Sequence, residues 1–400
     1  MKKLFGVLLA VLSMVALLCA CTSTKNPPDG DGGTNPPEPG PGPEVSKIVD
    51  ISVADYKDTF HVGEEFSAGD LTVTAYYEDG TEKVITDEQY SVDSTAFNAE
   101  KAGEYAITVK AGEATDSYKV LVRSSLKILS IGNSFSEDAH QYLCKVIKSI
   151  GHYDEVITGS LTIGGCELQR HYNNAKNNTA AYAYRKEVYR KGSNSEVTNS
   201  PTKRTIMSAL VEEDWDYVTL QQVSQDSGRP ETIPYNQLEA LSEYVRAPIN
   251  NKYLKVAWHS TWAYQANSSH GGFINYDKHQ MTMYHAIMDV AQEVIIPSGQ
   301  FELIIPTGTA VQNARTSYVG DTLTRDGFHM SYDRGRFLVS LMFYKGLTGD
   351  SIEAIAQADI LSIVGTEAYA KQVNATFVDM AIESVNNAYK TPFEVTKSTY

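Results

Sequence analysis

The chain has 400 residues, 42% of them apolar and 21% charged, and its formal net charge is −15 at pH 7. A chain of this length exceeds one ordinary hydrophobic core, so two or three domains are expected. The acidic balance argues against binding to nucleic acid and against electrostatic binding to anionic lipid. It is compatible with a substrate that is neutral or carries little negative charge.

The first 21 residues have the pattern of an export signal. Lys2 and Lys3 precede an apolar run from Leu4 to Leu18, which is too short for a comfortable membrane span. The run ends in Leu-Cys-Ala-Cys at 18–21, which resembles the lipobox of bacterial lipoproteins. The resemblance implies that 1–21 is a signal peptide, that Cys21 is lipidated, and that the anchored protein resides in the cell envelope. The anchored protein would lie at the outer membrane or the cell surface, and the periplasmic face of a membrane is a further possible location. An ordinary signal peptide with a chance cysteine is the alternative.

A tether and a β-domain follow this leader. Residues 22–44 contain no aliphatic or aromatic residue and seven of the fourteen prolines, which predicts an extended linker. Residues 45–124 contain short runs of alternating polar and apolar residues separated by turn signals, which predicts an all-β sandwich. The run from Tyr56 to Glu64, with the later Leu-Thr-Val-Thr-Ala and Asp-Gly-Thr segments, resembles bacterial immunoglobulin-like domains. The resemblance implies a spacer or adhesion module without chemistry.

From residue 125 to about 392, predicted strands alternate with predicted helices. Apolar strands are expected at 127–131, 217–220, 255–258 and 303–305, and helical spacing appears at 138–150, 236–245 and 277–294. This alternation predicts an α/β domain with a parallel sheet covered by helices on both faces. Ligands in such sheets bind beyond the carboxyl ends of the strands.

Two motifs at opposite ends of the α/β domain carry chemistry. Gly-Asn-Ser at 132–134 follows the first strand, which places Ser134 at the sheet's carboxyl edge and at the start of a helix. Asp-Gly-Phe-His at 326–329 spaces Asp326 and His329 so that the carboxylate can fold back onto one imidazole nitrogen. The other nitrogen would then face the serine, in the logic of a catalytic triad.

These motifs resemble the blocks of the SGNH (GDSL-like) hydrolase superfamily over residues 125–392. Asn133 stands where the family carries Asp, and the Asp-x-x-His block is intact. The resemblance implies a flavodoxin-like sheet and a serine esterase with Ser134 as nucleophile, His329 as base and Asp326 as its orienting partner. It implies no cofactor and no metal.

The oxyanion donors are less clearly indicated. The resemblance places a glycine block at Ile-Gly-Gly-Cys 163–166, with the backbone amide of Gly165 as the second donor. No asparagine occupies the third block, where strand 216–220 runs into Gln221. An ungapped register puts Gln225 at the site, and a tighter turn puts Gln222 there. A glutamine amide offers the same donor on a longer arm. Ordinary strand-end hydrogen bonding is the other interpretation.

A cluster of aromatic residues follows the strand at 255–258. Trp258, Trp262 and Tyr264 are either buried aromatics or, with His259, a wall of the substrate pocket where a sugar ring could stack. His259 is also a rival general base, although no carboxylate lies near it in sequence. Cys144 and Cys166 are either a disulfide or two buried free thiols.

Two functions are compatible with these features. The first is an esterase that removes O-acyl, chiefly O-acetyl, groups from carbohydrates at the cell envelope. Its partners are then an acylated carbohydrate and, only through the lipid anchor, a membrane. The alternative is a non-catalytic SGNH-like surface lipoprotein that binds glycans.

Overall fold

The computed structural model describes residues 46–400. The predicted signal peptide, Cys21 and the whole of the predicted linker lie outside the described residues. Within 46–400, no helix combines the length and the apolar character that crossing a bilayer requires.

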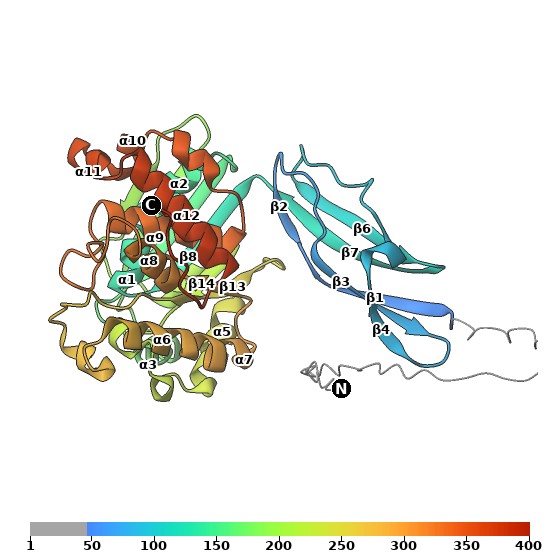
Figure 1. Cartoon of the computed structure of the whole chain (residues 1–400), viewed down its shortest axis with the longest axis horizontal. Helices are drawn as coiled ribbons and strands as arrows, with labels where there is room; N and C mark the ends of the chain where they lie inside the picture. Colours follow the sequence, from blue (N-terminus) through green and yellow to red (C-terminus); the bar gives the residue numbers. More distant parts are fainter. Residues whose placement is uncertain (1–45) are drawn as a thin grey trace, which may run out of the picture. The chain divides into compact units, whose positions relative to one another are not determined.

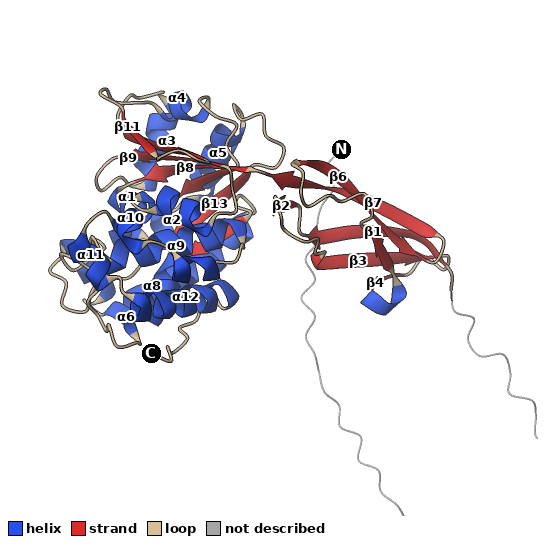
Figure 2. Ribbon diagram, turned by 90° about the horizontal axis from the view of Figure 1, so that it is seen from above, coloured by secondary structure: helices blue, strands red, loops and turns tan. Residues whose placement is uncertain are grey.

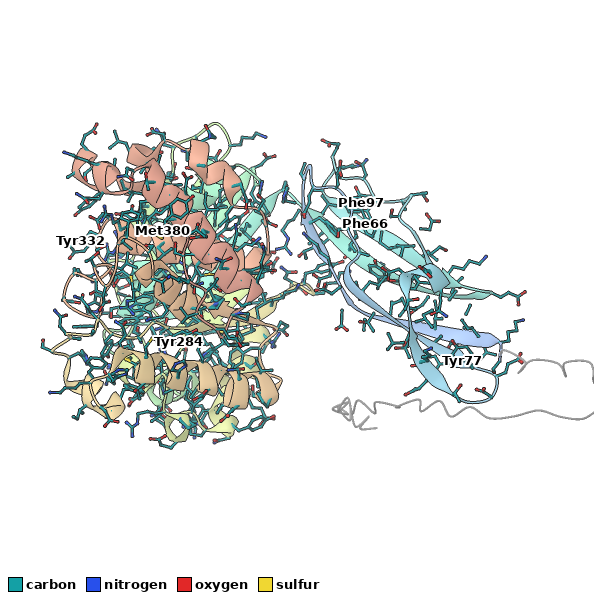
Figure 3. The ribbon with its side chains drawn as sticks, in the orientation of Figure 1. Phe66, Tyr77, Phe97, Tyr284, Tyr332 and Met380 are labelled. Carbon is teal, nitrogen blue, oxygen red and sulfur yellow. The ribbon has the colours of Figure 1, made fainter. Side chains whose placement is uncertain are left out.

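The β-domain consists of two sheets whose inward residues alternate with outward ones along each strand. Val73 and Ala75 of one sheet and Ile107, Val109 and Val120 of the other are fully buried in a shared core. Phe66 and Phe97, labelled in Figure 3, pack against this core. Their ring centroids lie 5.4 Å apart. The first sheet has the order β1 (Ile48–Tyr56), β3 (Gly69–Tyr77), β4 (Glu82–Ile85), and the second β2 (Thr59–His61), β7 (Ala114–Arg123), β6 (Gly103–Ala111), β5 (Ser91–Asp93).

The α/β domain is built on a seven-stranded sheet. Its strands lie in the order β11 (Glu196–Asn199), β10 (Ala183–Arg190), β9 (Glu155–Thr162), β8 (Ser125–Gly132), β12 (Tyr217–Leu220), β13 (Lys255–Ser260), β14 (Leu303–Pro306). The five strands from β9 to β14 in this order are parallel. In chain order they lie second, first, third, fourth, fifth, which is the flavodoxin-like order. The direction of winding changes between β8 and β12, and ligand sites form at such a point.

The other two strands differ from the prediction of a purely parallel sheet. β10 pairs with β9 and β11 pairs with β10, both antiparallel. Every residue of β11 is exposed, whereas β12 is buried throughout. A hairpin needs no crossover helix, and its outer strand carries polar residues that tolerate a water-exposed edge.

Helices cover both faces of this sheet, as expected. Alternate residues of each central strand enter two separate cores: Ile128, Tyr217 and Ala257 face one, and Leu129, Val218 and Trp258 face the other. Figure 2 shows the two helical layers on either side of the strands. The first layer contains α1 (Ser134–His140), α2 (Leu143–Ile150), α6 (Gln280–Val290), α8 (Thr307–Arg315), α9 (Arg334–Thr348) and α12 (Ala375–Lys390), and the second α3 (Leu168–Lys176), α4 (Ile206–Leu210) and α5 (Tyr235–Arg246).

Short elements complete the chain. The helix predicted at 277–294 begins at Gln280 as α6 and continues through a π-helical turn, and α7 extends it beyond the predicted end. Figure 1 shows α10 and α11 near the C-terminal helix α12. The short elements are η1 (Asp87–Gln89), η2 (Ser224–Asp226), η3 (Pro230–Thr232), η4 (Gly271–Tyr276), η5 (Ala291–Ile295), α7 (Ile296–Ser298), η6 (Glu353–Gln357), α10 (Ile360–Val364) and α11 (Glu367–Gln372).

The helix predicted at 138–150 begins earlier and is broken. α1 starts at Ser134, and α2 starts after an interruption at Gln141 and Tyr142. Asn133 caps α1, because its side-chain oxygen accepts a hydrogen bond from the backbone N–H of Phe135 at 3.0 Å. Asparagine is among the preferred N-cap residues. The cap therefore starts the helix at the serine itself.

Candidate active site

The structure brings Ser134, His329 and Asp326 together in one hydrogen-bonded chain. Ser134 Oγ lies 2.8 Å from His329 Nε2, and His329 Nδ1 lies 2.7 Å from Asp326 Oδ2. Ser134 and His329 are 195 residues apart in the chain, and they meet because one follows β8 and the other lies on the loop before α9. Both side chains are partly exposed, so a substrate can reach them.

Asp326 is held in the charged form that a triad requires. Burial disfavours the charge, but hydrogen bonds from the His329 ring and from the backbone N–H groups of His329 and Phe328 outweigh it. The pKa of Asp326 therefore lies below its usual value. Its second oxygen, Oδ1, accepts from His329 N at 2.8 Å and from Phe328 N at 3.2 Å, which fixes the carboxylate.

Gly165, the predicted oxyanion donor, lies in a turn that is hydrogen-bonded to Asn133, the residue before Ser134. The turn after β9 is closed by a hydrogen bond from Cys166 N to Ile163 O, and Gly165 has φ of 60°. A positive φ of this kind is easily adopted by glycine. Asn133 Nδ2 donates to Cys166 O at 3.1 Å, so the turn is tied to the nucleophile loop. Within the described residues, no hydrogen bond occupies the N–H of Gly165 or of Ser134.

The two glutamines predicted as oxyanion donors do not bond to the serine. Gln222 Nε2 donates to Thr232 O at 2.9 Å, and Gln222 Oε1 accepts from the N–H groups of Leu168 and Val223. Gln225 packs its Cβ against Gly272, where no larger residue would fit. Gln222 thus braces the start of α3, and this geometry does not support it as the donor.

Gln221, which the spacing did not single out, contacts the nucleophile loop instead. Its Nε2 donates to Asn133 Oδ1 at 2.8 Å, and its Oε1 lies 2.8 Å from His259 Nδ1. All three residues are at most 1% exposed. A proton on His259 Nδ1 orients the amide of Gln221, which in turn orients Asn133 so that its Nδ2 reaches Cys166. An aspartate at 133 would lack that donor, which explains the departure from the Gly-Asp-Ser pattern.

The aromatic residues after β13 form a core, so the prediction of a substrate wall is not supported. Trp258 is 3% exposed, and Trp262 and Tyr264 are fully buried. Trp262 stacks on Phe135 at 4.2 Å and donates its indole N–H to Phe328 O. Tyr264 bonds its hydroxyl to Ser224 Oγ at 2.8 Å. The loop at 326–329 covers Trp262 from a distant part of the chain, which the local sequence does not reveal.

His259 and the two cysteines have structural surroundings. Burial lowers the pKa of His259 to about 3, and its described neighbours include no carboxylate bonded to it, so it does not rival His329 as a base. Cys144 and Cys166 are free and buried, in agreement with the second of the two alternatives. Burial raises the pKa of Cys166 to about 12.

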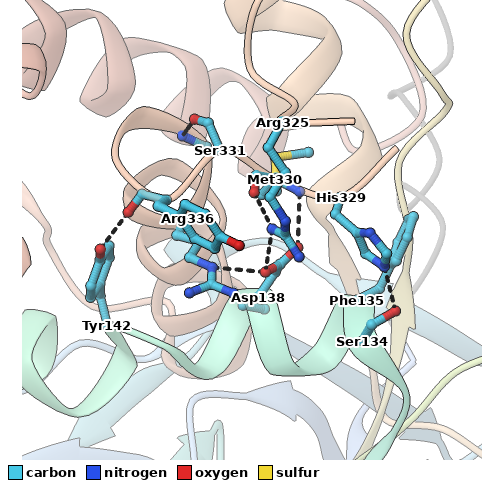
Figure 4. A network of polar contacts seen from close by, with 12 residues as sticks. Ser134, Phe135, Asp138, Tyr142, Arg325, His329, Met330, Ser331 and Arg336 are labelled. Carbon is cyan, nitrogen blue, oxygen red and sulfur yellow. Dashed lines mark hydrogen bonds and ion pairs between the residues drawn. The ribbon is translucent and has the colours of Figure 1, made fainter. Parts of the chain in front are cut away.

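A buried ionic cluster that the sequence analysis missed joins the nucleophile helix to the base loop (Figure 4). Asp138, fully buried one turn after Ser134, accepts from Arg325 Nη1 at 3.0 and 3.1 Å and from Arg336 Nε at 2.8 Å. It also accepts from Met330 N at 2.9 Å, next to His329. The available signal was an acid four residues after Ser134 and an arginine on each side of the Asp-x-x-His motif.

Comparison with protein families identifies the N-terminal module. Residues 53–122 match the bacterial Ig-like domain (group 3), which confirms the predicted immunoglobulin-like module. No curated protein matches the chain.

Solved structures give further similarities. A DUF4886 family protein from Bacteroides uniformis is 37% identical and aligns over 68% of this chain and 98% of its own, with a TM-score of 0.59. A candidate SGNH hydrolase from Slackia heliotrinireducens is 20% identical over 56% of this chain and 99% of its own, with a TM-score of 0.37. LAE5, an alpha/beta hydrolase enzyme from the Lake Arreo metagenome, is 13% identical and aligns over 57% of this chain and 97% of its own, with a TM-score of 0.34. Residues 127–356, more than half of the chain, match the domain of unknown function DUF4886, so this chain belongs to the DUF4886 family.

Proposed function

We propose that the α/β domain is a serine esterase that hydrolyses O-acyl esters, chiefly O-acetyl esters, on carbohydrates at the cell envelope. The observation that carries the proposal is the unbroken chain from Ser134 Oγ through His329 to Asp326, with separations of 2.8 and 2.7 Å. These are hydrogen-bond distances with the nucleophile, base and orienting group in the order that acyl transfer requires.

The steps follow from this arrangement. His329 Nε2 takes the proton of Ser134 as Oγ attacks the acyl carbon, and Asp326 stabilises the imidazolium through Nδ1. In this proposal the backbone N–H groups of Ser134 and Gly165, which no hydrogen bond occupies among the described residues, stabilise the developing oxyanion, where fixed donors lower the barrier. His329 then gives its proton to the leaving alcohol oxygen. Water attacks the acyl-serine in a second step with His329 again as base, which releases the acid and restores the serine.

The carbohydrate part of the proposal rests on the rest of the chain. The immunoglobulin-like module and the predicted tether suit an enzyme that meets polymers outside the cytoplasm. The lipid anchor on Cys21 belongs to the same proposal and lies outside the described residues. A net charge of −15 fits a neutral substrate better than nucleic acid or an anionic lipid surface.

A small ester and a covalent probe test the chemistry. The wild type should hydrolyse p-nitrophenyl acetate and be labelled at Ser134 by a fluorophosphonate, and Ser134→Ala should lose both, with kcat several orders of magnitude lower. Absence of turnover and of labelling in the folded wild type would refute the esterase and favour the glycan-binding alternative.

A substrate panel then tests the class of ester. The panel sets acetylated xylan, pectin and sialic acid against p-nitrophenyl esters from C2 to C12. Release of acetate from a glycan supports the proposal. Preference for chains of C8 or longer, with no acetate released from any glycan, would contradict it and point to lipid esters.

A further inference from the structure

A cavity of about 180 Å³ with a mixed polar and apolar lining lies between α1 and the edge of the sheet formed by β9, β10 and β11. Glu137, His140 and Gln141 line it from the helix side, and the residues that line it from the strands include Ser160, Thr162, Ala183, Arg185 and Asn199. Trp258, Trp262 and Tyr264 are buried elsewhere, so this cavity is a different place from the wall expected from the sequence.

The cavity lies next to the candidate nucleophile. Glu137 follows Ser134 by three residues on α1, and side chains at this spacing lie about 5–6 Å apart at Cβ. Thr162 is the ladder partner of Gly132, which precedes Asn133 and Ser134. Thr162 also ends β9 just before the turn that contains Gly165. The cavity therefore flanks both loops that form the candidate active site.

The strand register gathers polar groups on the cavity side of the sheet. Ser160 is the ladder partner of Arg185, and Arg185 is the partner of Asn199, so the three side chains share one face. Ser160 is 4% exposed, and its hydroxyl has no hydrogen-bond partner among the described residues. Buried hydroxyls in proteins are ordinarily hydrogen-bonded, so water or a ligand in the cavity is the remaining partner.

The charges around the cavity disfavour an anion. Arg185 Nη2 lies 2.6 Å from Glu187 Oε2, and Glu187 is fully buried, so the guanidinium is already neutralised. Glu187 Oε1 has no partner among the described residues, and Glu187 lies behind Arg185 without lining the cavity itself. Glu137 adds an exposed carboxylate at the rim. One cation against two carboxylates, with hydroxyl and amide groups between them, suits a neutral ligand rich in hydroxyl groups.

We propose that this cavity is the subsite for a neutral sugar ring that carries or adjoins the scissile ester. The inference rests on the proposed esterase function and adds the part of the substrate that the protein recognises. At about 30 Å³ for each water, the volume corresponds to roughly six water molecules, and a hydroxyl-rich ring that displaces them keeps hydrogen bonds with Ser160, Asn199 and Arg185.

A bulky residue at the exposed position 183 tests the proposal. Ala183→Trp should fill the cavity mouth and raise KM for acetylated xylo-oligosaccharides at least tenfold, while kcat and KM for p-nitrophenyl acetate stay unchanged. Thr198→Trp is the matched control, because Thr198 is exposed on the same sheet edge and pairs with Lys186, on the opposite face. Thr198→Trp should leave kcat and KM unchanged for both substrates.

A second variant tests the same proposal in case Ala183→Trp does not fold. Ser160→Ala removes only the unpartnered hydroxyl. KM for the acetylated xylo-oligosaccharide should rise about three- to tenfold, and kcat and KM for p-nitrophenyl acetate should stay unchanged. Equal KM for the sugar ester in the wild type and both variants would overturn the subsite.

The choice of sugar distinguishes the subsite from the esterase function itself. The wild type should prefer acetylated xylo-oligosaccharides to acetylated oligogalacturonides and sialic acid, which are anionic. Preference for the anionic sugars, or turnover of p-nitrophenyl acetate with no sugar ester cleaved, would overturn the subsite and leave the esterase intact. A folded wild type without p-nitrophenyl acetate turnover and without fluorophosphonate labelling at Ser134 would overturn both.

Discussion

Replacing Asp138 with asparagine should loosen the loop that carries His329 without removing any reacting group. The carboxylate is fully buried and accepts from Arg325, Arg336 and the N–H of Met330. Asparagine keeps the shape but loses the charge, and its NH₂ group faces a guanidinium. Breaking a fully buried ion pair by removing one partner costs about 3–5 kcal/mol. Asp138 is buried, but Arg325 and Arg336 keep part of their side chains in water, so the lower end of that range applies here.

The effect on catalysis follows from the position of Met330. Met330 is adjacent to His329, so a freed loop moves the imidazole away from Ser134, and a displacement of about 1 Å can lower the rate about 100-fold. We therefore expect Asp138→Asn to lower kcat for p-nitrophenyl acetate about 100-fold with little change in KM, and to lower the free energy of unfolding by about 3 kcal/mol.

Urea unfolding and steady-state kinetics, both at pH 7, measure the two effects. Asp379→Asn is a suitable control, since Asp379 is an exposed acid on α12 and belongs to no ion pair among the described residues. A double-mutant cycle of Asp138→Asn with Arg336→Gln should give a coupling energy of about 0.5–3 kcal/mol. A folded Asp138→Asn variant with wild-type kcat would refute the view that this cluster positions the base.

Three further predictions concern the surroundings of the triad. Asn133→Asp should lower kcat for p-nitrophenyl acetate about 10- to 100-fold, because it removes the donor to Cys166 O and loosens the turn that holds Gly165; wild-type kcat in that variant would contradict the role of Asn133. His329→Ala should be as damaging to kcat as Ser134→Ala, whereas His259→Ala should cost less than 100-fold, since His259 acts only through Gln221; the reverse order would mean that His259 is the base. Burial lowers the pKa of His140, His171 and His259 to about 3. In the unfolded chain a histidine has a pKa of about 6.5, so below that pH the unfolded state binds more protons than the folded state. The free energy of unfolding should therefore fall as pH drops from 6.5 towards 3, by about 1.4 kcal/mol per pH unit for each histidine. Urea unfolding at pH 7 and pH 5 measures this slope, and His171→Gln should reduce it by about one histidine's share; equal stability at both pH values would contradict the prediction.

The parts of the candidate site that the sequence indicated depend on local patterns. Apolar strands followed by short polar motifs place Ser134 and Gly165 at one edge of a parallel sheet, because the carboxyl ends of parallel strands meet there. The three-residue spacing of Asp326 and His329 brings their side chains together within a single loop. Such features need only the chain direction and a few neighbouring residues.

The orientation of the glutamines needed the tertiary structure. Gln221 and Gln222 are adjacent at the end of β12, and adjacent residues of an extended chain point to opposite sides. The local sequence does not tell which side faces the nucleophile. That choice depends on Asn133 and His259, which come from two other strand ends.

Burial and long-range ion pairing were also decided by the fold. Trp262 is covered by Phe135 and by the carbonyl of Phe328, so an aromatic run typical of a sugar platform becomes a core. Asp138 meets Arg325 and Arg336 across 187 and 198 residues. Such pairings depend on how whole helices and loops pack together, and the acid after Ser134 and the arginines around the Asp-x-x-His motif do not by themselves tell which of them meet.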